Sequence, residues 1–274
     1  MDDALIIECY KKGMSLRQIA KEFHIDRKRC SKILKANNIQ IRDTSITSRK
    51  YNCNHNYFET IDCPEKAYWI GFLAADGFIE SKRINGAQKL GVTLSKKDEA
   101  HLHLFNQMLD SDYEIKTYVG SGYNPEGEYS KLLITSQKLV DDLRKYGIVE
   151  NKTSILMFPK NLPQEYYNDY MRGYFDGDGS IYYQSNGQYG ISFTGTYNVL
   201  KTIKTLCGLN VKIREAGNGV YEMSANSSFN AYRVCCQMYY DENCVKLDRK
   251  YEKFLELKKY VERQGIQIGW RGAH

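Results

Sequence analysis

Two short segments of the chain share one pattern, which constrains the fold more than any other feature. Residues 67–77 read AYWIGFLAADG, and residues 170–179 read YMRGYFDGDG. Each segment is a bulky apolar stretch with small residues four apart, and each ends in Asp-Gly. The last aspartates, Asp76 and Asp178, stand about a hundred residues apart, a period that indicates duplication of a whole folding unit.

The small residues of each segment lie on one face of the expected helix. Gly71 and Ala75 are four residues apart, and Gly173 and Gly177 repeat that spacing. A glycine inside a helix costs about 1 kcal/mol relative to alanine. Small residues at this spacing are typical of helices that pack backbone to backbone. We therefore expect the two motif helices to be in direct contact.

Two aspartates are expected to meet where these helices end. Gly77 and Gly179 stand where a C-terminal cap would need a left-handed residue, and Asp76 and Asp178 precede them. Carboxylates forced together repel, and a divalent cation relieves that repulsion. Mg²⁺ prefers carboxylate oxygen, keeps several waters and accepts phosphate oxygen. We expect Asp76 and Asp178 to bind Mg²⁺ or another divalent cation such as Mn²⁺.

Length and charge indicate the number of units and the class of partner. The chain has 274 residues, 42% of them hydrophobic, enough for two or three units with buried cores. Residues 1–60 contain 12 Lys and Arg against 7 Asp and Glu, a net charge of 12 − 7 = +5. The whole chain has a net charge of +6, so nearly all of it lies in this part. A basic N-terminal part favours contact with a polyanion.

The cysteines and the absence of long apolar runs bear on the compartment. No apolar run could span a membrane, and the start, Met-Asp-Asp-Ala, is acidic where a secretory signal would be basic. No C-x-x-C pair occurs among the eight cysteines, so we expect no disulfides. A zinc site at Cys53, His55 and Cys63 is a minor alternative, because a second pair of ligands is missing. We expect a soluble, cytoplasmic protein of a bacterial or phage-infected cell, associated with the nucleoid.

Residues 4–38 predict a compact unit of three helices. Ser15 and Asp26 are the expected N-caps of the second and third helices. The spacing resembles that of a helix-turn-helix DNA-binding motif, although His24 stands where glycine is common and Cys30 where an aliphatic residue is. In that motif the third helix enters the major groove. The basic residues that it would expose are Arg27, Lys28, Arg29, Lys32 and Lys35. The alternative is a small helical bundle whose charges only keep it soluble.

The remainder predicts two copies of the order helix, two strands, helix, two strands, helix. We expect a helix-turn-helix unit at 1–40, a linker at 41–60 and repeats at 61–163 and 164–274. The expected motif helices cover 64–76 and 165–178, and a last amphipathic helix covers 248–262. Hairpins rather than crossovers join the strands, so the fold class is α+β with antiparallel sheets.

The paired segments resemble the two motifs of a single-chain LAGLIDADG homing endonuclease, over about residues 57–260. The first motif of that family often reads AYW-x-GF-x-x-ADG, and the second reads RG-x-FDGDG. The resemblance implies a pseudo-twofold saddle of tandem αββαββα repeats, in which the last acid of each motif binds metal and supports hydrolysis of one DNA strand. These acids are Asp76 and Asp178. The first copy departs from the pattern at Ala74, where the second has Asp176.

The resemblance also implies a lysine near the end of each repeat, close to the scissile phosphate. The matching segments are Val149-Glu-Asn-Lys152 and Leu247-Asp-Arg-Lys250. Such lysines could offset developing negative charge. Ordinary solvated lysines are the alternative, and Lys246 and Lys253 compete with Lys250 for the role.

In the family each sheet forms half of a surface that lies in the major groove. The polar faces of the expected strands nominate Lys116, Tyr118, Lys212 and Arg214, with Lys82, Arg83 and Lys89 behind them. Each could contact phosphate rather than a base edge.

The resemblance therefore implies a monomeric, Mg²⁺-dependent endonuclease that makes a double-strand break in an asymmetric DNA target. No terminal His-Asn follows the last repeat, so we expect an intron-encoded or freestanding enzyme rather than an intein. Two alternatives stay open. One is a LAGLIDADG-derived transcription regulator, although such proteins tend to lose both acids. The other is an intron RNA maturase, which could use another surface of the same fold.

Overall fold

A computed structural model describes residues 3–41, 50–81, 86–120 and 126–265. The chain divides into two compact units between Tyr51 and Asn52.

The first unit contains three short helices around one small core. They are α1 (Asp3–Lys11), α2 (Leu16–Glu22) and α3 (Arg27–Ala36). Ser15 forms a capping box with Gln18 at the start of α2, and the Asp26 carboxylate accepts a 2.6 Å hydrogen bond from the Lys28 amide at the start of α3. The core consists of Ile6, Tyr10, Ile19, Cys30 and Leu34.

The turn between α2 and α3 shows why glycine is common at the position of His24. His24 has a left-handed φ of 51°, a conformation that glycine adopts most easily. Cys30 is fully buried in the core, where it takes the place of an aliphatic residue.

The second unit contains the two expected repeats. The first comprises α5 (Pro64–Ala75), β1 (Gly77–Ile79), β2 (Lys89–Ser95), α6 (Glu99–Met108), β3 (Lys116–Val119), β4 (Glu128–Thr135) and α7 (Gln137–Lys145). The second comprises α8 (Tyr167–Asp178), β5 (Gly179–Tyr183), β6 (Tyr189–Gly195), α9 (Tyr197–Leu206), β7 (Ile213–Gly217), β8 (Val220–Ala225) and α10 (Ser228–Met238). The helix α11 (Asp248–Arg263) follows, and single 3-10 turns occur at η1 (Lys96–Asp98), η2 (Lys152–Ser154) and η3 (Gln164–Tyr166).

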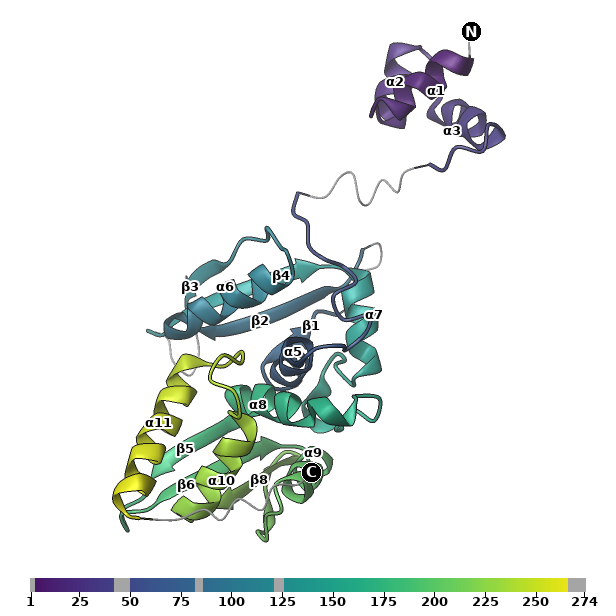
Figure 1. Ribbon diagram of the computed structural model, residues 1–274. Coiled ribbons are helices and arrows are strands. Elements are labelled where there is room, and N and C mark those ends of the chain that lie inside the picture. Colours follow the sequence, from purple (N-terminus) through teal and green to yellow (C-terminus); the bar gives the residue numbers. More distant parts are fainter. Residues whose placement is uncertain (1–2, 42–49, 82–85, 121–125, 266–274) are drawn as a thin grey trace. The chain divides into compact units, whose positions relative to one another are not determined.

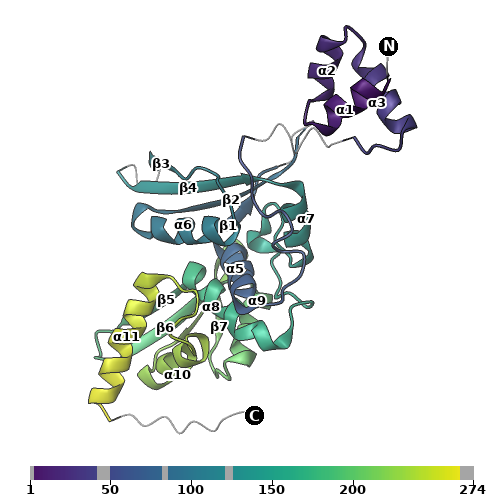
Figure 2. The ribbon, with the colours of Figure 1, turned by 45° about the horizontal axis from the view of Figure 1, so that its top comes forward.

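The repeats form two equivalent antiparallel sheets. Their strand orders are β1-β2-β4-β3 and β5-β6-β8-β7, so each sheet has the same topology. The motif helices α5 and α8 lie side by side between the two sheets (Figures 1 and 2). Because α5 is enclosed on all sides, its residues 67–74 are all buried. The α+β class and the tandem αββαββα order are confirmed.

Two boundaries differ from the sequence-based expectation. The compact unit already begins at Asn52, so the second half of the expected linker 41–60 belongs to the folded body. Phe58 is fully buried in its core, and the Asn54 amide donates a 2.7 Å hydrogen bond to the Leu109 carbonyl. The second motif helix begins at Tyr167 rather than at 165.

In the ranges that the structure describes, helices of sufficient length and apolar character to cross a membrane do not occur.

Candidate active site

The two motif helices touch through their glycines. A Cβ placed on Gly71 would overlap the Tyr170 carbonyl oxygen and lie 2.9 Å from the Tyr174 amide nitrogen. A Cβ on Gly173 would overlap the Tyr68 carbonyl oxygen in the same way. Real Cβ atoms do not approach backbone so closely, so both positions require glycine. The crossing of the helices is therefore the close one that the spacing predicted.

The ends of the two helices bring Asp76 and Asp178 to one place. Asp76 is the C-cap of α5, and Asp178 is the last residue of α8. A Cβ added to Gly177 would lie only 3.2 Å from the Asp76 Oδ2 atom. The Asp76 carboxylate thus reaches the residue that precedes Asp178, and the two carboxylates are close enough to interact electrostatically.

The prediction for Gly77 and Gly179 as left-handed caps was wrong. Gly179 has an extended backbone with φ −102° and ψ 171°, and neither glycine has a positive φ. Both are the first residues of strands, and their role is steric. A Cβ on Gly77 would lie 2.6 Å from the Leu73 carbonyl oxygen, and one on Gly179 would overlap the Phe175 ring.

Burial and mutual repulsion disfavour the charged forms of the two acids. Burial first, and then the charge of Asp178, raise the pKa of Asp76 to about 6, against partial relief from Lys250, Lys152 and Arg249. Burial also raises the pKa of Asp178, and Lys152 and Lys250 oppose that rise. In a protein without bound metal this pair is a local source of instability.

Asp76→Asn is therefore expected to stabilise the metal-free protein at pH 8. Because the pKa of the folded state lies above the ordinary value of 3.8, the stability contribution of Asp76 falls as pH rises from about 4 to about 6 and stays lost above that. The expected gain in free energy of unfolding at pH 8 is roughly 1–3 kcal/mol. Urea unfolding at pH 8 and pH 4 measures it. An equal gain at both values would contradict this explanation.

Lys152 reaches the first motif helix from the end of the first repeat. It begins the single turn η2, and its side chain is buried. Its Nζ atom donates a 3.0 Å hydrogen bond to the carbonyl of Ala75, the residue before Asp76. Burial lowers the pKa of Lys152, and the charges of Asp178 and Asp76 oppose that effect.

Lys250 has the corresponding position in the second repeat. It lies in the first turn of α11, and its buried Nζ atom donates to the Phe175 carbonyl at 3.0 Å and to the Gly179 carbonyl. Burial lowers the pKa of Lys250 to about 8 against the attraction of Asp176, Asp76 and Asp178. The competing lysines contact other groups: Lys246 donates to the Cys244 carbonyl, and Lys253 pairs with Glu256 at 2.7 Å.

Two carboxylates and two ammonium groups thus converge at the ends of α5 and α8. The two halves are equivalent in type, since each has one acid from a motif helix and one lysine that caps a carbonyl of that helix. The lysines partly neutralise the acids and also provide donors for an anion.

The inner acid of the second motif has a role that the sequence did not reveal. Asp176 has no exposed surface. It accepts hydrogen bonds from the Tyr68 hydroxyl at 2.8 Å, the Tyr239 hydroxyl at 2.7 Å and the Leu247 amide at 2.7 Å. Leu247 is the N-cap of α11, so Asp176 fixes the start of the helix that carries Lys250. Its presence in only one motif was the available signal.

Arg249 is a further cation near this site that sequence reasoning missed. Its Nε atom donates a 2.8 Å hydrogen bond to Asp98 of the first repeat, while about half of its side chain is exposed. This ion pair ties the start of α11 to the opposite repeat.

The candidates for contact with nucleic acid lie on exposed surface of both sheets and of α3. Lys116 and Tyr118 belong to the exposed strand β3, where Tyr118 stacks on Tyr129 with ring centroids 5.8 Å apart. Lys212 and Arg214, next to and within β7, line a hollow of about 560 Å³. The candidates of α3, Arg27, Lys28, Arg29 and Lys32, are exposed together with Lys35.

Of the three secondary candidates, the structure describes Lys89. Lys89 pairs with Glu80 at 3.4 Å, whereas Lys82 and Arg83 lie outside the described residues.

The zinc alternative gains no support from the side-chain contacts. His55 Nδ1 lies 3.4 Å from Cys53 Sγ and 2.8 Å from Ser136 Oγ. Cys63 stands at the N-terminus of α5. Among the described residues, no group of three or more His, Cys, Asp or Glu side chains is arranged so that it could hold a metal ion.

Comparison with solved structures identifies the fold. The meganuclease I-SmaMI, bound to uncleaveable DNA, is 12% identical with a TM-score of 0.52, and the match covers 75% of this chain and 91% of that chain. The LAGLIDADG meganuclease I-AabMI, bound to uncleaved DNA, is 13% identical with a TM-score of 0.50, covering 74% and 92%. The LAGLIDADG homing endonuclease I-GzeII, in complex with its DNA target, is 13% identical with a TM-score of 0.50, covering 76% and 93%.

No protein-family model matches the sequence, and no curated protein matches it. At the identities of the solved structures the likeness establishes the fold, which is that of the single-chain LAGLIDADG homing endonucleases. The resemblance expected from the paired motifs is confirmed at that level.

Proposed function

We propose that this chain is a site-specific DNA endonuclease that uses a divalent cation, Mg²⁺ in the first place, to hydrolyse one phosphodiester bond in each strand. The observation that supports this most is the convergence of Asp76 and Asp178 at the ends of two touching helices, each acid with a buried lysine beside it. The solved structures of the same fold are nucleases with DNA, which agrees with the proposal.

The residues that would hold the cation are Asp76 and Asp178. Their buried, mutually repelling carboxylates fit a hard cation, and two protein ligands suit Mg²⁺, which takes water and phosphate oxygen for its other positions. When bound there, the cation would polarise the scissile phosphate and lower the pKa of a bound water.

The two lysines would stabilise the negative charge that develops on the phosphate. An ammonium group has three N–H donors. The Ala75 carbonyl accepts one from Lys152, so the group can also donate to a phosphate oxygen. Because both lysines are buried, their charges act through a medium of lower dielectric than water.

The two sheets and the N-terminal helices would bind the DNA. We propose Lys116, Tyr118, Lys212 and Arg214 as contacts of the two repeats, 61–163 and 164–274, and a separate contact by the unit 1–40. The side chains of the two sheets differ, so one monomeric chain would recognise an asymmetric target.

A plasmid assay tests the proposed activity. The substrate is a supercoiled plasmid that contains the two DNA segments on either side of the gene of this protein. The two segments are joined directly to each other, as they would be at a site without the gene. The full chain and Mg²⁺ are expected to linearise it, and EDTA is expected to prevent this. Failure at every Mg²⁺ and Mn²⁺ concentration, with binding to the same DNA retained, would overturn the proposal in favour of a transcription regulator.

Replacing the basic residues of α3 is expected to weaken DNA binding and its salt dependence. The fourfold variant Arg27→Gln, Lys28→Gln, Arg29→Gln, Lys32→Gln keeps the buried core of this unit. If these residues contact phosphates, the slope of log affinity against log salt falls by roughly 2 to 4, because fewer counterions are released. Fluorescence anisotropy with the same flanking DNA at several salt concentrations measures it.

The matched control replaces two exposed lysines at the C-terminal end of α1. Lys11→Gln and Lys12→Gln remove charge from the same unit but leave the residues of α3 unchanged. A control slope that falls as much as that of the fourfold variant would show a diffuse charge effect instead of contact through α3. An unchanged slope in both would reject a DNA-binding role for residues 1–40.

A further inference from the structure

The two lysines of the candidate active site are carried by very different elements. Lys250 belongs to α11, a helix of 16 residues, whose N-cap amide is bound by Asp176. Lys152 begins the single turn η2, and the residue before it, Asn151, is left-handed with φ 54°. A single turn has little stability of its own. Lys152 therefore needs support from outside its own element.

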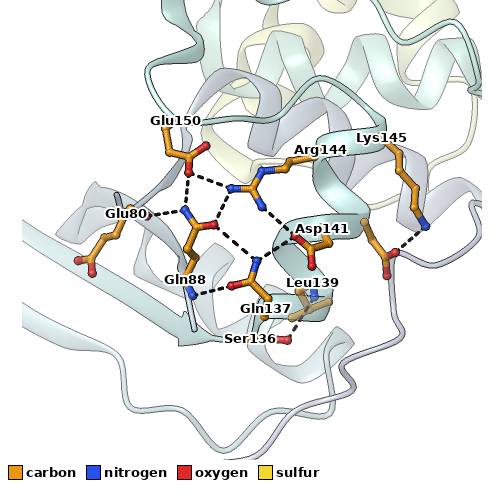
Figure 3. A network of polar contacts seen from close by, with 10 residues as sticks. Glu80, Gln88, Ser136, Gln137, Leu139, Asp141, Arg144, Lys145 and Glu150 are labelled. Carbon is orange, nitrogen blue, oxygen red and sulfur yellow. Dashed lines mark hydrogen bonds and ion pairs between the residues drawn. The ribbon is translucent and has the colours of Figure 1, made fainter. Parts of the chain in front are cut away.

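A cluster of polar side chains in the first repeat includes Glu150, two residues before Lys152 (Figure 3). Arg144, from α7, donates to the Gln88 Oε1 atom at 2.6 Å and to the Glu150 Oε1 atom at 2.8 Å. Gln88, which precedes β2 and is buried, donates in turn to Glu150. Three side chains thus bind one another in a closed triangle, which we name the Gln88–Arg144–Glu150 clamp.

Two members of the clamp, Arg144 and Gln88, are also bonded to other parts of the first repeat. Arg144 also pairs with Asp141 at 2.8 Å, and Gln137 bridges Asp141 to the Gln88 amide. The Gln88 side chain also donates to the Glu80 carbonyl at 3.2 Å. The corner that remains is Glu150, which stands two residues before Lys152 in the turn after α7.

The second repeat holds its lysine in another way. Asp248 stands at the position of Glu150, but it is the first residue of α11. In the second repeat the segment before the lysine is held by a hydrogen bond from the Leu247 amide to the Asp176 carboxylate of α8. The first motif has Ala74 at the place of Asp176 and so offers no carboxylate for such a tie. The side-chain clamp and the carboxylate are alternative means of fixing the same part of the repeat.

We propose that the Gln88–Arg144–Glu150 clamp positions Lys152, and that it thereby controls cleavage of one DNA strand without affecting the other. The proposal rests on the proposed endonuclease function. Gln88, Arg144 and Glu150 are positioning residues, since they act on the phosphate only through Lys152. Displacing a catalytic group by about 1 Å can cost roughly 100-fold in rate.

The test compares the two strands in the supercoiled plasmid described above. Lys152→Met first identifies the strand whose cleavage depends on Lys152. Arg144→Met, which opens the clamp, is then expected to slow that same strand by roughly 10- to 100-fold and to leave the other strand within about twofold. Nicked plasmid accumulates, and run-off sequencing on each strand locates the nick.

The matched control is the neighbouring residue of α7. Lys145→Met removes an ion pair with Asp142, which Lys138 continues to neutralise at 2.6 Å, and it lies outside the clamp (Figure 3). This variant should cleave both strands like the wild type. Glu150→Gln keeps an acceptor for both partners and should retain most cleavage of the affected strand, whereas Glu150→Ala should behave like Arg144→Met.

The outcomes separate this inference from the proposed function. If the wild type does not cleave, the proposed function fails. If the wild type cleaves and Arg144→Met, at an unchanged melting temperature, slows both strands equally or neither strand, the endonuclease stands and the clamp has no positioning role. Loss of folding in Arg144→Met would show as a lower melting temperature with both strands slowed. Glu150→Ala and Glu150→Gln then decide the question by their strand preference.

Discussion

Asp76→Asn and Asp178→Asn are each expected to abolish double-strand cleavage by the full chain, with a fall in rate of at least roughly 1000-fold. Each acid supplies a carboxylate where the two helix ends meet, and an amide oxygen cannot replace its charge toward a divalent cation. Removal of a negative charge beside a phosphate does not oppose DNA binding. Affinity for the same DNA should therefore stay within about threefold of the wild type or rise.

Linearisation of the supercoiled plasmid and anisotropy with the flanking DNA measure the two effects separately. Asp241→Asn is a suitable control, because Asp241 is exposed and an amide oxygen could still accept the hydrogen bond from the Asn243 amide. The control should cleave normally. If either active-site variant linearised the plasmid at a rate near that of the wild type, the two aspartates would not form the catalytic centre.

The features that the sequence predicted correctly depend on local patterns. The motif helices follow from apolar runs with small residues four apart, and the contact through Gly71 and Gly173 follows from the cost of glycine in a helix. The choice of Lys152 and Lys250 came from the resemblance of two short segments to the homing endonuclease family, and their catalytic role stays a prediction. In both cases the information lies within a few consecutive residues.

The features that the sequence missed depend on contacts between distant segments. Asp176 is bound by Tyr68 and by Leu247, which lie on opposite sides of it in the chain and far from it. The clamp joins Gln88 to Glu150 in the same way. A side chain of this kind has no periodicity that distinguishes it from a solvated polar residue. The error at Gly77 had another origin. Its steric contact is with Leu73, only four residues before it, and depends on the path of the chain after the helix.

Gly71→Ala and Gly173→Ala are expected to destabilise the second unit although alanine favours helices. The added methyl group would overlap a carbonyl oxygen of the opposite motif helix in each case, so the two backbones must move apart. Overpacking of this kind costs typically 1–3 kcal/mol and can cost more against rigid backbone. It outweighs the gain in helix propensity of about 1 kcal/mol. Because the overlap is with backbone atoms in both variants, we expect a cost of about 3 kcal/mol or more and therefore a net loss in free energy of unfolding of about 2 kcal/mol or more.

The same displacement should reduce cleavage of both strands together. Because Asp76 and Asp178 are fixed to the ends of these helices, separating the helices separates the carboxylates, and a shift of about 1 Å can cost roughly 100-fold in rate. Lys201→Ala, on the exposed face of α9, controls for substitution to alanine and should change stability by less than about 0.5 kcal/mol. Urea unfolding and strand-resolved cleavage measure the effects. Equal stability of Gly71→Ala and the wild type would mean that the helices do not cross in direct contact, and the geometry that brings the two aspartates together would lose its support.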